Sequence, residues 1–180
     1  MLKLEEPSMK YISSFINAVE EGFSSHMALS DFDALSLESL KSEPEQYLLR
    51  LNSKETQKII TPDKREFNLY DHDIYWLTDG FSKFIGGVSI RYDKDCDLIS
   101  KCCGHVGINI RKTLQGMGYG SEALKLIFNI VKSRKLLSFL MSCSPSNKAS
   151  RNLIKKFGGK LVSINDFFGY GDMELYVINI

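Results

Sequence analysis

Apolar positions recur at helical spacing near the start of the chain and predict a helix over Ser8–Gly22. Ser8 suits the beginning of this helix and Gly22 its end, and the apolar stripe consists of Tyr11, Ile12, Phe15, Ile16 and Val19. A second helical region follows, in which Pro44 should break the helix or begin a new one. Its apolar positions are Leu37, Leu40, Tyr47, Leu48 and Leu51. The polar stretch Asn52–Asn68 contains Pro62 and predicts a mobile loop.

Runs of β-branched and aromatic residues predict a hairpin in the middle of the chain. Its strands are Ile74–Thr78 and Phe84–Arg91, which flank Asp79-Gly80, a dipeptide that suits a turn with positive φ. After a polar interval, Gly104–Arg111 predicts a further strand. That strand runs directly into a glycine-rich turn.

Helical spacing returns after this turn, at Tyr119, Ala123, Leu126, Ile127 and Ile130. The nearly continuous apolar run Leu136–Cys143 predicts a buried strand. Asn147 can cap a last helix that Gly158-Gly159 ends, with an inward face of Ala149, Leu153, Ile154 and Phe157. Strands are expected near Lys160–Ile164 and Met173–Ile178. The order of elements predicts an α+β fold with a mixed sheet, in a single domain over residues 1–180.

The charge of the chain is balanced, with 23 Lys and Arg against 22 Asp and Glu. A net charge of +1 gives no field that would attract nucleic acid or an anionic membrane, and the lysines are interspersed along helices. No apolar run approaches the roughly 20 residues that span a bilayer, and the first residues lack the pattern of a secretory signal. We therefore expect a cytoplasmic protein without nucleic-acid or membrane partners.

The four cysteines are expected to be reduced thiols rather than a disulfide framework or a metal site. Cys96, Cys102, Cys103 and His105 lie close in sequence, but no C-x-x-C is present, and adjacent cysteines in an extended segment would face opposite ways. Cys143 is expected to be buried in the core. No metal ion is predicted.

The turn Gln115–Gly120 lies between an apolar strand and an amphipathic helix. The first amides of a helix lack internal partners and carry partial positive charge, so a pyrophosphate can bind there without a lysine. The glycines do not match the nucleoside triphosphate loop or the dinucleotide fingerprint, which disfavours both ligands. The alternative is that the glycines only permit a tight turn.

These residues resemble the GNAT superfamily of acetyl-CoA-dependent N-acyltransferases, whose signature is [QR]-x-x-G-x-[GA]. Gln115, Gly118 and Gly120 match it in register, and the block Ser146–Arg151 through Gly159 resembles the family's Asn-x-x-Ala/Ser helix. Together the two blocks cover about residues 104–164. Within the superfamily the chain looks most like a group of predicted bacterial acetyltransferases and, more distantly, the acetyltransferases of ribosomal-protein N-termini.

The resemblance implies a GNAT-like, mainly antiparallel central sheet flanked by helices, with a strand-turn-helix site for acetyl-CoA as cosubstrate. It also implies direct transfer of the acetyl group to a primary amine of a small molecule or peptide. The amides that would hold the pyrophosphate are those of Gln115, Gly116, Met117, Gly118, Tyr119, Gly120 and Ser121. The pantetheine arm would pair with Ile108, Asn109 and Ile110 on one side and contact Asn147 and Ser150 on the other.

Catalysis requires a base for the ammonium and an acid for the departing thiolate. His105 is the candidate base, because related enzymes often carry Glu at this position; the alternative is a partly buried histidine that holds the strand edge. Where many members have a Tyr acid, this chain has Ile154. Either the thiolate leaves unassisted or is protonated by water, or another hydroxyl, that of Tyr170, Tyr176 or Ser150, acts as the acid. The missing Tyr also motivates a second hypothesis, a non-catalytic acyl-CoA-binding module for sensing or interaction.

The acceptor amine is expected to meet the first helices, the hairpin and the loop near Phe167–Gly171. Carboxylates there could attract a cationic amine and aromatic residues could receive an apolar portion: Glu20, Glu21, Asp71, Asp73, Asp95, Tyr70, Trp76, Phe167 and Phe168. The alternative for each charge is a solvated side chain, and the sequence assigns none of these residues a role. For Trp76 we favour packing in the core or a subunit interface. Edge strands leave both a monomer and a homodimer open.

Overall fold

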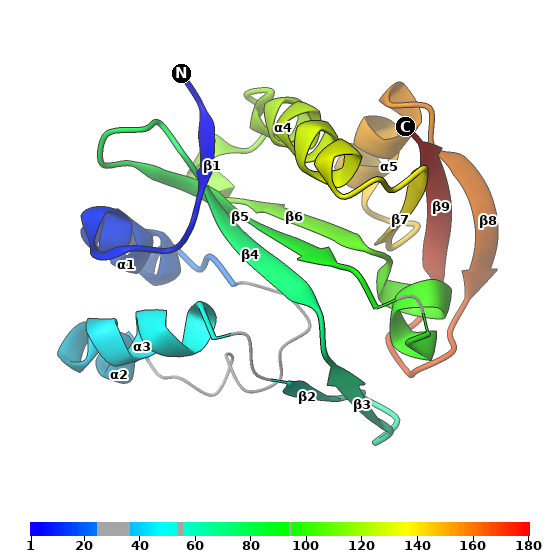
Figure 1. Cartoon of the computed structure of the whole chain (residues 1–180), viewed down its shortest axis with the longest axis horizontal. Coiled ribbons are helices and arrows are strands. Elements are labelled where there is room, and N and C mark those ends of the chain that lie inside the picture. The colour runs from blue at the N-terminus through cyan, green and yellow to red at the C-terminus, as the bar shows by residue number, and fades with distance from the viewer. Residues whose placement is uncertain (25–36, 54–55, 94) are drawn as a thin grey trace.

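The computed structural model describes residues 1–24, 37–53, 56–93 and 95–180, and its helices cover both faces of a central sheet. On one side lie α1 (Ile12–Glu20), α2 (Leu37–Ser42) and α3 (Pro44–Leu51), and on the other α4 (Tyr119–Ser133) and α5 (Lys148–Lys156) (Figure 1). Short helical turns occupy Met9–Tyr11, Ile99–Cys103 and Lys112–Leu114. Pro44 begins α3 as its first residue, and Gly22, with φ +84°, follows α1, as predicted.

The described strands pair only in antiparallel fashion. The central sheet has the order β1-β4-β5-β6, with β1 Lys3–Glu5, β4 His72–Thr78, β5 Phe84–Arg91 and β6 Val106–Ile110. A second sheet has the order β7-β9-β8, with β7 Ser138–Cys143, β9 Met173–Asn179 and β8 Lys160–Asn165. The predicted α+β fold and the hairpin around Asp79-Gly80 are confirmed, whereas the described pairings are all antiparallel where a mixed sheet was expected.

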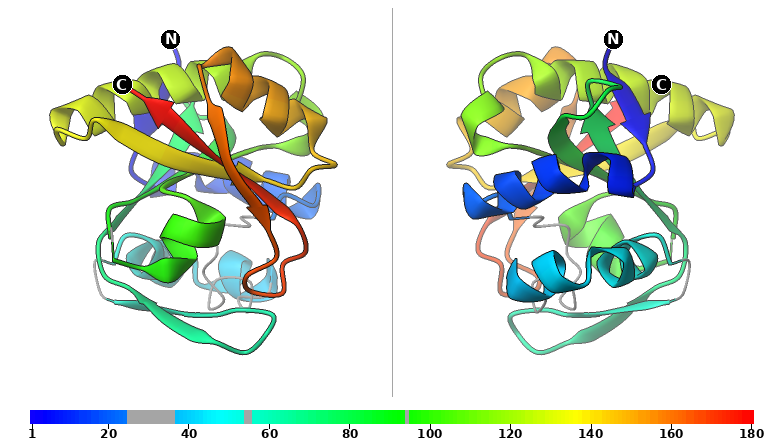
Figure 2. Two further views of the ribbon diagram at one scale, coloured as in Figure 1. Left: turned by 90° about the vertical axis from the view of Figure 1, so that its right-hand side faces the viewer. Right: turned by 90° about the vertical axis from the view of Figure 1, so that its left-hand side faces the viewer.

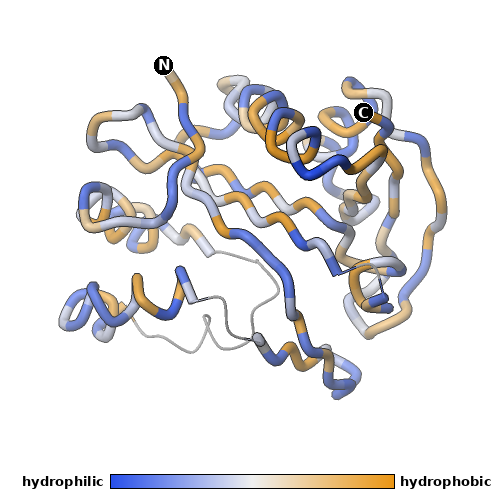
Figure 3. Tube along the Cα trace, viewed as in Figure 1, coloured by the Kyte–Doolittle hydropathy of each residue, from blue (hydrophilic) through white to orange (hydrophobic). Residues whose placement is uncertain are grey.

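The described apolar side chains form a hydrophobic cluster on each face of the central sheet. One joins α1, α2 and α3 to the sheet and contains Trp76, which is 2% exposed and stacks on Phe15 at 4.6 Å between ring centroids. The other joins α4 and α5 to the sheet and contains Val88, Ile127 and Ile154. Both faces of the sheet are thus covered, and hydrophobic and hydrophilic positions alternate along its strands (Figure 3). The core position expected for Trp76 is confirmed.

The segment Asn52–Asn68 was predicted as a loop, and this prediction is wrong for its described residues. β2 (Gln57–Ile60) and β3 (Glu66–Leu69) form a two-stranded antiparallel sheet. Ile59 is buried on one strand and Leu69 on the other, whereas Pro62 lies in the connecting turn. The hairpin lies at the end of the molecule opposite the two chain termini (Figure 2).

Several local expectations also need correction. Leu137 is 87% exposed, and β7 alternates between buried and more exposed positions, so it is not a strand buried on both faces. Ala149 is exposed rather than on the inward face of α5, and the Ser8 side chain makes no capping hydrogen bond. Cys102 and Cys103 lie in the helical turn 99–103, not in an extended segment.

Candidate active site

The glycine-rich turn connects β6 to α4 and presents unpaired backbone amides. Gly116 and Gly118 have φ of +78° and +86°, a conformation that favours glycine, and an added Cβ at either would meet no atom within 4 Å. Among the described residues, none accepts a hydrogen bond from the backbone amides of residues 116–120. α4 begins at Tyr119, so its partial positive charge adds to these donors. The turn is an open cradle for an anion.

The turn is held by contacts on both sides. The Gln115 side chain donates from Nε2 to the Ile110 carbonyl oxygen at 3.0 Å, which ties the turn to the end of β6. An added Cβ at Gly120 would lie 3.3 Å from Leu153, so glycine here lets the start of α4 approach α5. Lys156 of α5 donates to the Ser121 hydroxyl at 3.3 Å and brings a cation to the turn.

β6 has one edge without a strand partner among the described residues. The Arg91 amide donates to the His105 carbonyl at 2.8 Å, and the Arg111 amide to the Ile85 carbonyl at 2.9 Å. Because antiparallel pairing alternates along a strand, the main-chain groups of Ile108 and Ile110 point away from β5. The Ile110 carbonyl is already bonded to Gln115, whereas Ile108 offers both of its groups to the gap before β7.

The side chains of α5 and of its cap range from exposed at Asn147 to fully buried at Ile154. Asn147 caps α5 as predicted, since its Oδ1 accepts from the Ser150 amide at 3.0 Å. Its amide nitrogen is the group that remains for contact with a ligand. Asn109, in contrast, donates its side-chain amide to the Ser24 carbonyl, on the α1 side of the sheet. Ile154 is fully buried and points into the core.

His105 lies where β6 and β7 separate, next to a bridge between Gly104 and Met141. Its backbone amide donates to the Leu140 carbonyl at 2.8 Å, and its ring Nδ1 accepts from the Leu140 amide at 3.0 Å. An imidazole that accepts at Nδ1 carries its proton on Nε2. The ring therefore makes the contact expected of a histidine that holds the strand edge. Its role as a base stays a prediction.

The candidate acid Tyr176 is buried and hydrogen-bonded. It is 2% exposed, and its hydroxyl donates to Glu174 at 2.7 Å. Arg151 donates to the same carboxylate at 2.6 and 2.8 Å and lowers the pKa of Glu174, as the Tyr176 hydroxyl does to a lesser degree. Burial, followed by this hydrogen bond, raises the pKa of Tyr176 to about 12. The Tyr176 proton is thus directed at Glu174. Cys143 is buried nearby, as predicted.

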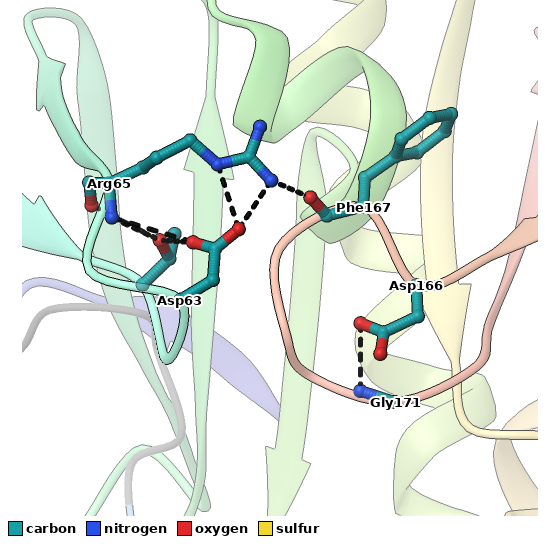
Figure 4. A network of polar contacts seen from close by, with 6 residues as sticks. Asp63, Arg65, Asp166, Phe167 and Gly171 are labelled. Carbon is teal, nitrogen blue, oxygen red and sulfur yellow. Dashed lines mark hydrogen bonds and ion pairs between the residues drawn. The ribbon is translucent and has the colours of Figure 1, made fainter.

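Tyr170 belongs to the loop between β8 and β9, which the β2–β3 hairpin holds in place (Figure 4). Arg65 in the hairpin turn donates to Asp63 and to the Phe167 carbonyl, and its guanidinium lies 4.4 Å from the Phe168 ring centroid. Tyr170 is 41% exposed. Burial and the nearby Cys103 and Cys102 thiols raise its pKa to about 12, so it keeps its proton at neutral pH.

Most of the carboxylates proposed for the acceptor amine already have cationic partners. Glu21 accepts from Arg111 at 2.7 Å, which lowers its pKa to about 2, and Glu20 pairs with Lys41. Asp73 pairs with Arg134 at 3.1 Å. Phe168 is 2% exposed and is a core residue.

Asp95 and Tyr70 instead line an open cavity of about 490 Å³ beside β3. Its other lining residues are Glu66, Phe67, Asn68, Asp93, Cys96 and Asp97. With Asp95, the cavity has four carboxylates, two of which pair with lysines, Glu66 with Lys58 and Asp97 with Lys101.

Ser89 and Arg91, which were not among the predicted site residues, are polar and buried in the central sheet. A signal was present, because the two alternate with apolar Val88 and Ile90 in a strand that is otherwise apolar or glycine.

Within the described ranges, no group of three or more His, Cys, Asp and Glu side chains could hold a metal ion. No helix there is long and apolar enough to cross a membrane.

Comparison with known proteins supports this arrangement. The family model described as acetyltransferase (GNAT) domain matches residues 25–160. No significant match was found among curated proteins.

Solved structures resemble the chain over nearly its whole length. RimL, a ribosomal L7/L12 alpha-N-protein acetyltransferase in complex with coenzyme A, has 16% identity and a TM-score of 0.62, over 99% of this chain and 94% of that chain. The microcin C7 self-immunity acetyltransferase MccE, in complex with acetyl-CoA and AMP, has 16% identity and a TM-score of 0.61, over 99% and 92%. A Salmonella typhimurium acetyltransferase that modifies the N-terminal serine of L7/L12 has 15% identity and a TM-score of 0.59, over 99% and 95%. At these identities the likeness shows the fold.

Proposed function

We propose that this chain, which belongs to the GNAT acetyltransferase family, transfers the acetyl group of acetyl-CoA directly to a primary amine of a small molecule or peptide. The proposal treats residues 1–180 as one cytoplasmic acetyltransferase domain. Two of the similar structures contain coenzyme A or acetyl-CoA, and the similar proteins include two that modify ribosomal protein L7/L12, which supports an amine acceptor.

The observation that carries the proposal is the continuity between the unpaired edge of β6 and the amide-rich turn that follows it. Ile108 offers a main-chain donor and acceptor to an extended amide-containing arm, as a neighbouring strand would. The turn that follows β6, with Gly116 and Gly118 eight and ten residues after Ile108, offers amides and a helix N-terminus to a pyrophosphate. A ligand with both groups in this order fits the described residues.

The reaction requires no covalent enzyme intermediate. The neutral amine attacks the thioester carbonyl carbon, a C–N bond forms, the C–S bond breaks and the sulfur leaves as a thiolate that takes up a proton. His105 is the candidate to accept the ammonium proton at Nδ1, after the hydrogen bond from the Leu140 amide to that atom opens. For the acid we favour Tyr170 over Tyr176, because Tyr170 is exposed and Tyr176 donates to Glu174.

An acyl-transfer assay tests the proposal. The purified chain is incubated with acetyl-CoA and a panel of primary amines and N-terminal peptides, and released thiol and acetylated product are both measured. Stoichiometric formation of both with any acceptor supports catalysis. Binding of acetyl-CoA without transfer to any acceptor would instead favour the non-catalytic module, for which Ile154 at the usual acid position is the supporting observation.

A further inference from the structure

Ser89 and Arg91 lie next to each other on the face of the central sheet that α1, α2 and α3 cover. Their neighbours in β5, Val88 and Ile90, belong to the cluster under α4, so the two polar side chains point the other way. In the register Ser89 is opposite Gly107 of β6. A Cβ at Gly107 would stand 2.8 Å from Ser89 Oγ and 3.6 Å from Arg91 Nη2. The absent side chain of Gly107 therefore leaves the hydroxyl and the guanidinium side by side over bare backbone.

The Arg91 guanidinium is a buried cation, and no carboxylate of the described residues pairs with it. Arg91 is 4% exposed, and its side chain donates from Nη1 to the Gly104 carbonyl at 3.2 Å. Among the described residues no Asp or Glu lies within ion-pair distance of it. Guanidinium has five N–H donors in a planar fork and remains charged in proteins, so most of its donors are left for another acceptor. A buried charge is unfavourable unless it is paired.

Ser89 gives an independent indication of a ligand. Its side chain is 3% exposed, and its hydroxyl has no hydrogen-bond partner among the described residues. Buried hydroxyls are normally satisfied, and an unsatisfied one suggests a missing partner. An oxyanion next to Gly107 would accept from the Ser89 hydroxyl and the Arg91 fork together.

We propose that Ser89 and Arg91 form a subsite for an acidic group, a carboxylate or a phosphate, on the amine that this enzyme acetylates. This inference rests on the proposed function. Gly107 immediately precedes Ile108, whose main chain faces the proposed acyl-CoA side, and neighbouring strands lie about 4.8 Å apart. The acceptor is therefore a compact anionic amine, with its acidic group only a few bonds from the nitrogen.

The acidic cavity beside β3 is compatible with this acceptor. Cys96 lines the cavity and lies near enough to Arg91 to interact with it electrostatically. An ammonium group would be attracted by the carboxylates of the cavity, whereas the acidic group would be attracted by Arg91. The competing explanation is that the Cys103 thiolate is the partner of Arg91. The hydrogen bond from Cys102, and then the Arg91 charge, lower the pKa of the Cys103 thiol.

The first test observes the guanidinium itself. The side-chain Nε–H resonance of Arg91, assigned by its loss in Arg91→Lys, is followed by NMR during titration with sodium phosphate or sodium acetate at constant ionic strength. Saturating CoA is present so that the turn is occupied, and the Arg134 resonance is the control, because Arg134 already pairs with Asp73. We expect a saturable shift at Arg91 alone, and an affinity about tenfold weaker in Ser89→Ala.

A saturable shift with either anion supports the subsite, and the anion that binds more tightly identifies the acidic group. No saturable shift with either anion, or equal shifts at Arg91 and Arg134, would overturn the subsite. A shift that appears only in Cys103→Ser would show that the Cys103 thiolate pairs with the Arg91 guanidinium in the wild type. This result would also overturn the subsite. This readout does not depend on acetyl transfer, so it holds even if the proposed function fails.

The second test compares acceptors in pairs that differ only in the acidic group, glycine with glycinamide and phosphoethanolamine with ethanolamine. We expect the wild type to prefer the anionic member of at least one pair by tenfold or more in kcat/KM, and Arg91→Met to lose that preference. Retained binding of acetyl-CoA by Arg91→Met shows that the variant is folded. A wild type that acetylates both members equally, or a variant with unchanged preference, would contradict the subsite without affecting the proposed acyl-CoA site.

Discussion

The ring Nδ1 of His105 accepts a hydrogen bond from the backbone amide of Leu140 at 3.0 Å, at the point where β6 and β7 separate. The backbone amide of His105 bonds back to the Leu140 carbonyl at 2.8 Å. A side chain thus continues the pairing of two strands that diverge beyond it. The unpaired edge of β6 begins at this position, which makes the contact part of the proposed acyl-CoA site.

Replacement of His105 separates this positioning role from a role as base. His105→Ala leaves the Leu140 amide without its partner, and we expect a loss of about 1–3 kcal/mol in the free energy of unfolding. In His105→Asn the side-chain oxygen can replace Nδ1 as acceptor, so stability should largely recover. Urea unfolding of the three proteins measures this. If the ring is only a positioning group, kcat also recovers in His105→Asn. A kcat that remains at least a hundredfold low in the stable Asn variant would instead identify His105 as the base.

The two candidate acids are expected to respond differently to loss of their hydroxyls. Tyr176→Phe removes a buried hydrogen bond to Glu174 and should lower the free energy of unfolding by about 1 kcal/mol with little change in kcat. Tyr170→Phe should leave stability nearly unchanged and lower kcat about tenfold or more. Steady-state kinetics at saturating acetyl-CoA distinguish the two. The reverse pattern would assign proton donation to Tyr176.

The Arg65 contacts should hold the loop that carries Tyr170. Arg65→Ala removes the bonds to Asp63 and to the Phe167 carbonyl, and we expect amide exchange in residues 166–172 to increase at least tenfold. Hydrogen exchange with mass spectrometry measures this effect. Arg50→Ala, on α3, is the matched control. Unchanged exchange in the loop of Arg65→Ala would show that the hairpin does not hold it.

The contact between Arg65 and Asp63 should persist at acidic pH. The hydrogen bonds from Arg65 and then Thr61 lower the pKa of Asp63 from 3.8 to about 2. A carboxylate with a lowered pKa in the folded state contributes stability above its unfolded pKa and loses it as the pH falls through the folded value. Exchange in the loop, corrected for its intrinsic pH dependence, should therefore be the same at pH 5 and pH 8. A marked increase at pH 5 would contradict the low pKa of Asp63.

Local patterns predicted those parts of the site in which sequence neighbours determine the conformation. The glycine positions of the turn, the cap at Asn147 and the apolar period of α4 each depend on residues within one or two turns of one another. Their positions therefore follow from the sequence. β6, the strand before the turn, was predicted from the sequence. Its unpaired edge was not, because that edge depends on where β7 diverges from β6.

The remaining features depend on residues that are distant in sequence. β2 and β3 are short strands that each carry one charged residue, and within the described part of the chain they pair with each other alone. Their buried side is marked by Ile59 and Leu69. The contact between His105 and Leu140 joins positions 35 residues apart. Arg91 became a candidate ligand-binding residue through the strand register, which places Gly107 opposite Ser89. No local sequence pattern predicts that the residue opposite on the neighbouring strand is a glycine.

The measurement that tests the account most directly is calorimetric titration of acetyl-CoA and CoA into the wild type, Gly118→Glu and Gly171→Glu. Gly118 and Gly171 both have positive φ and open space, so the two variants share backbone strain and added charge, but only Gly118 lies in the turn. We expect saturable binding to the wild type and Gly171→Glu, and a loss of at least a hundredfold in affinity in a folded Gly118→Glu. No binding to a folded wild type, or equal binding to all three proteins, would contradict an acyl-CoA site at this turn.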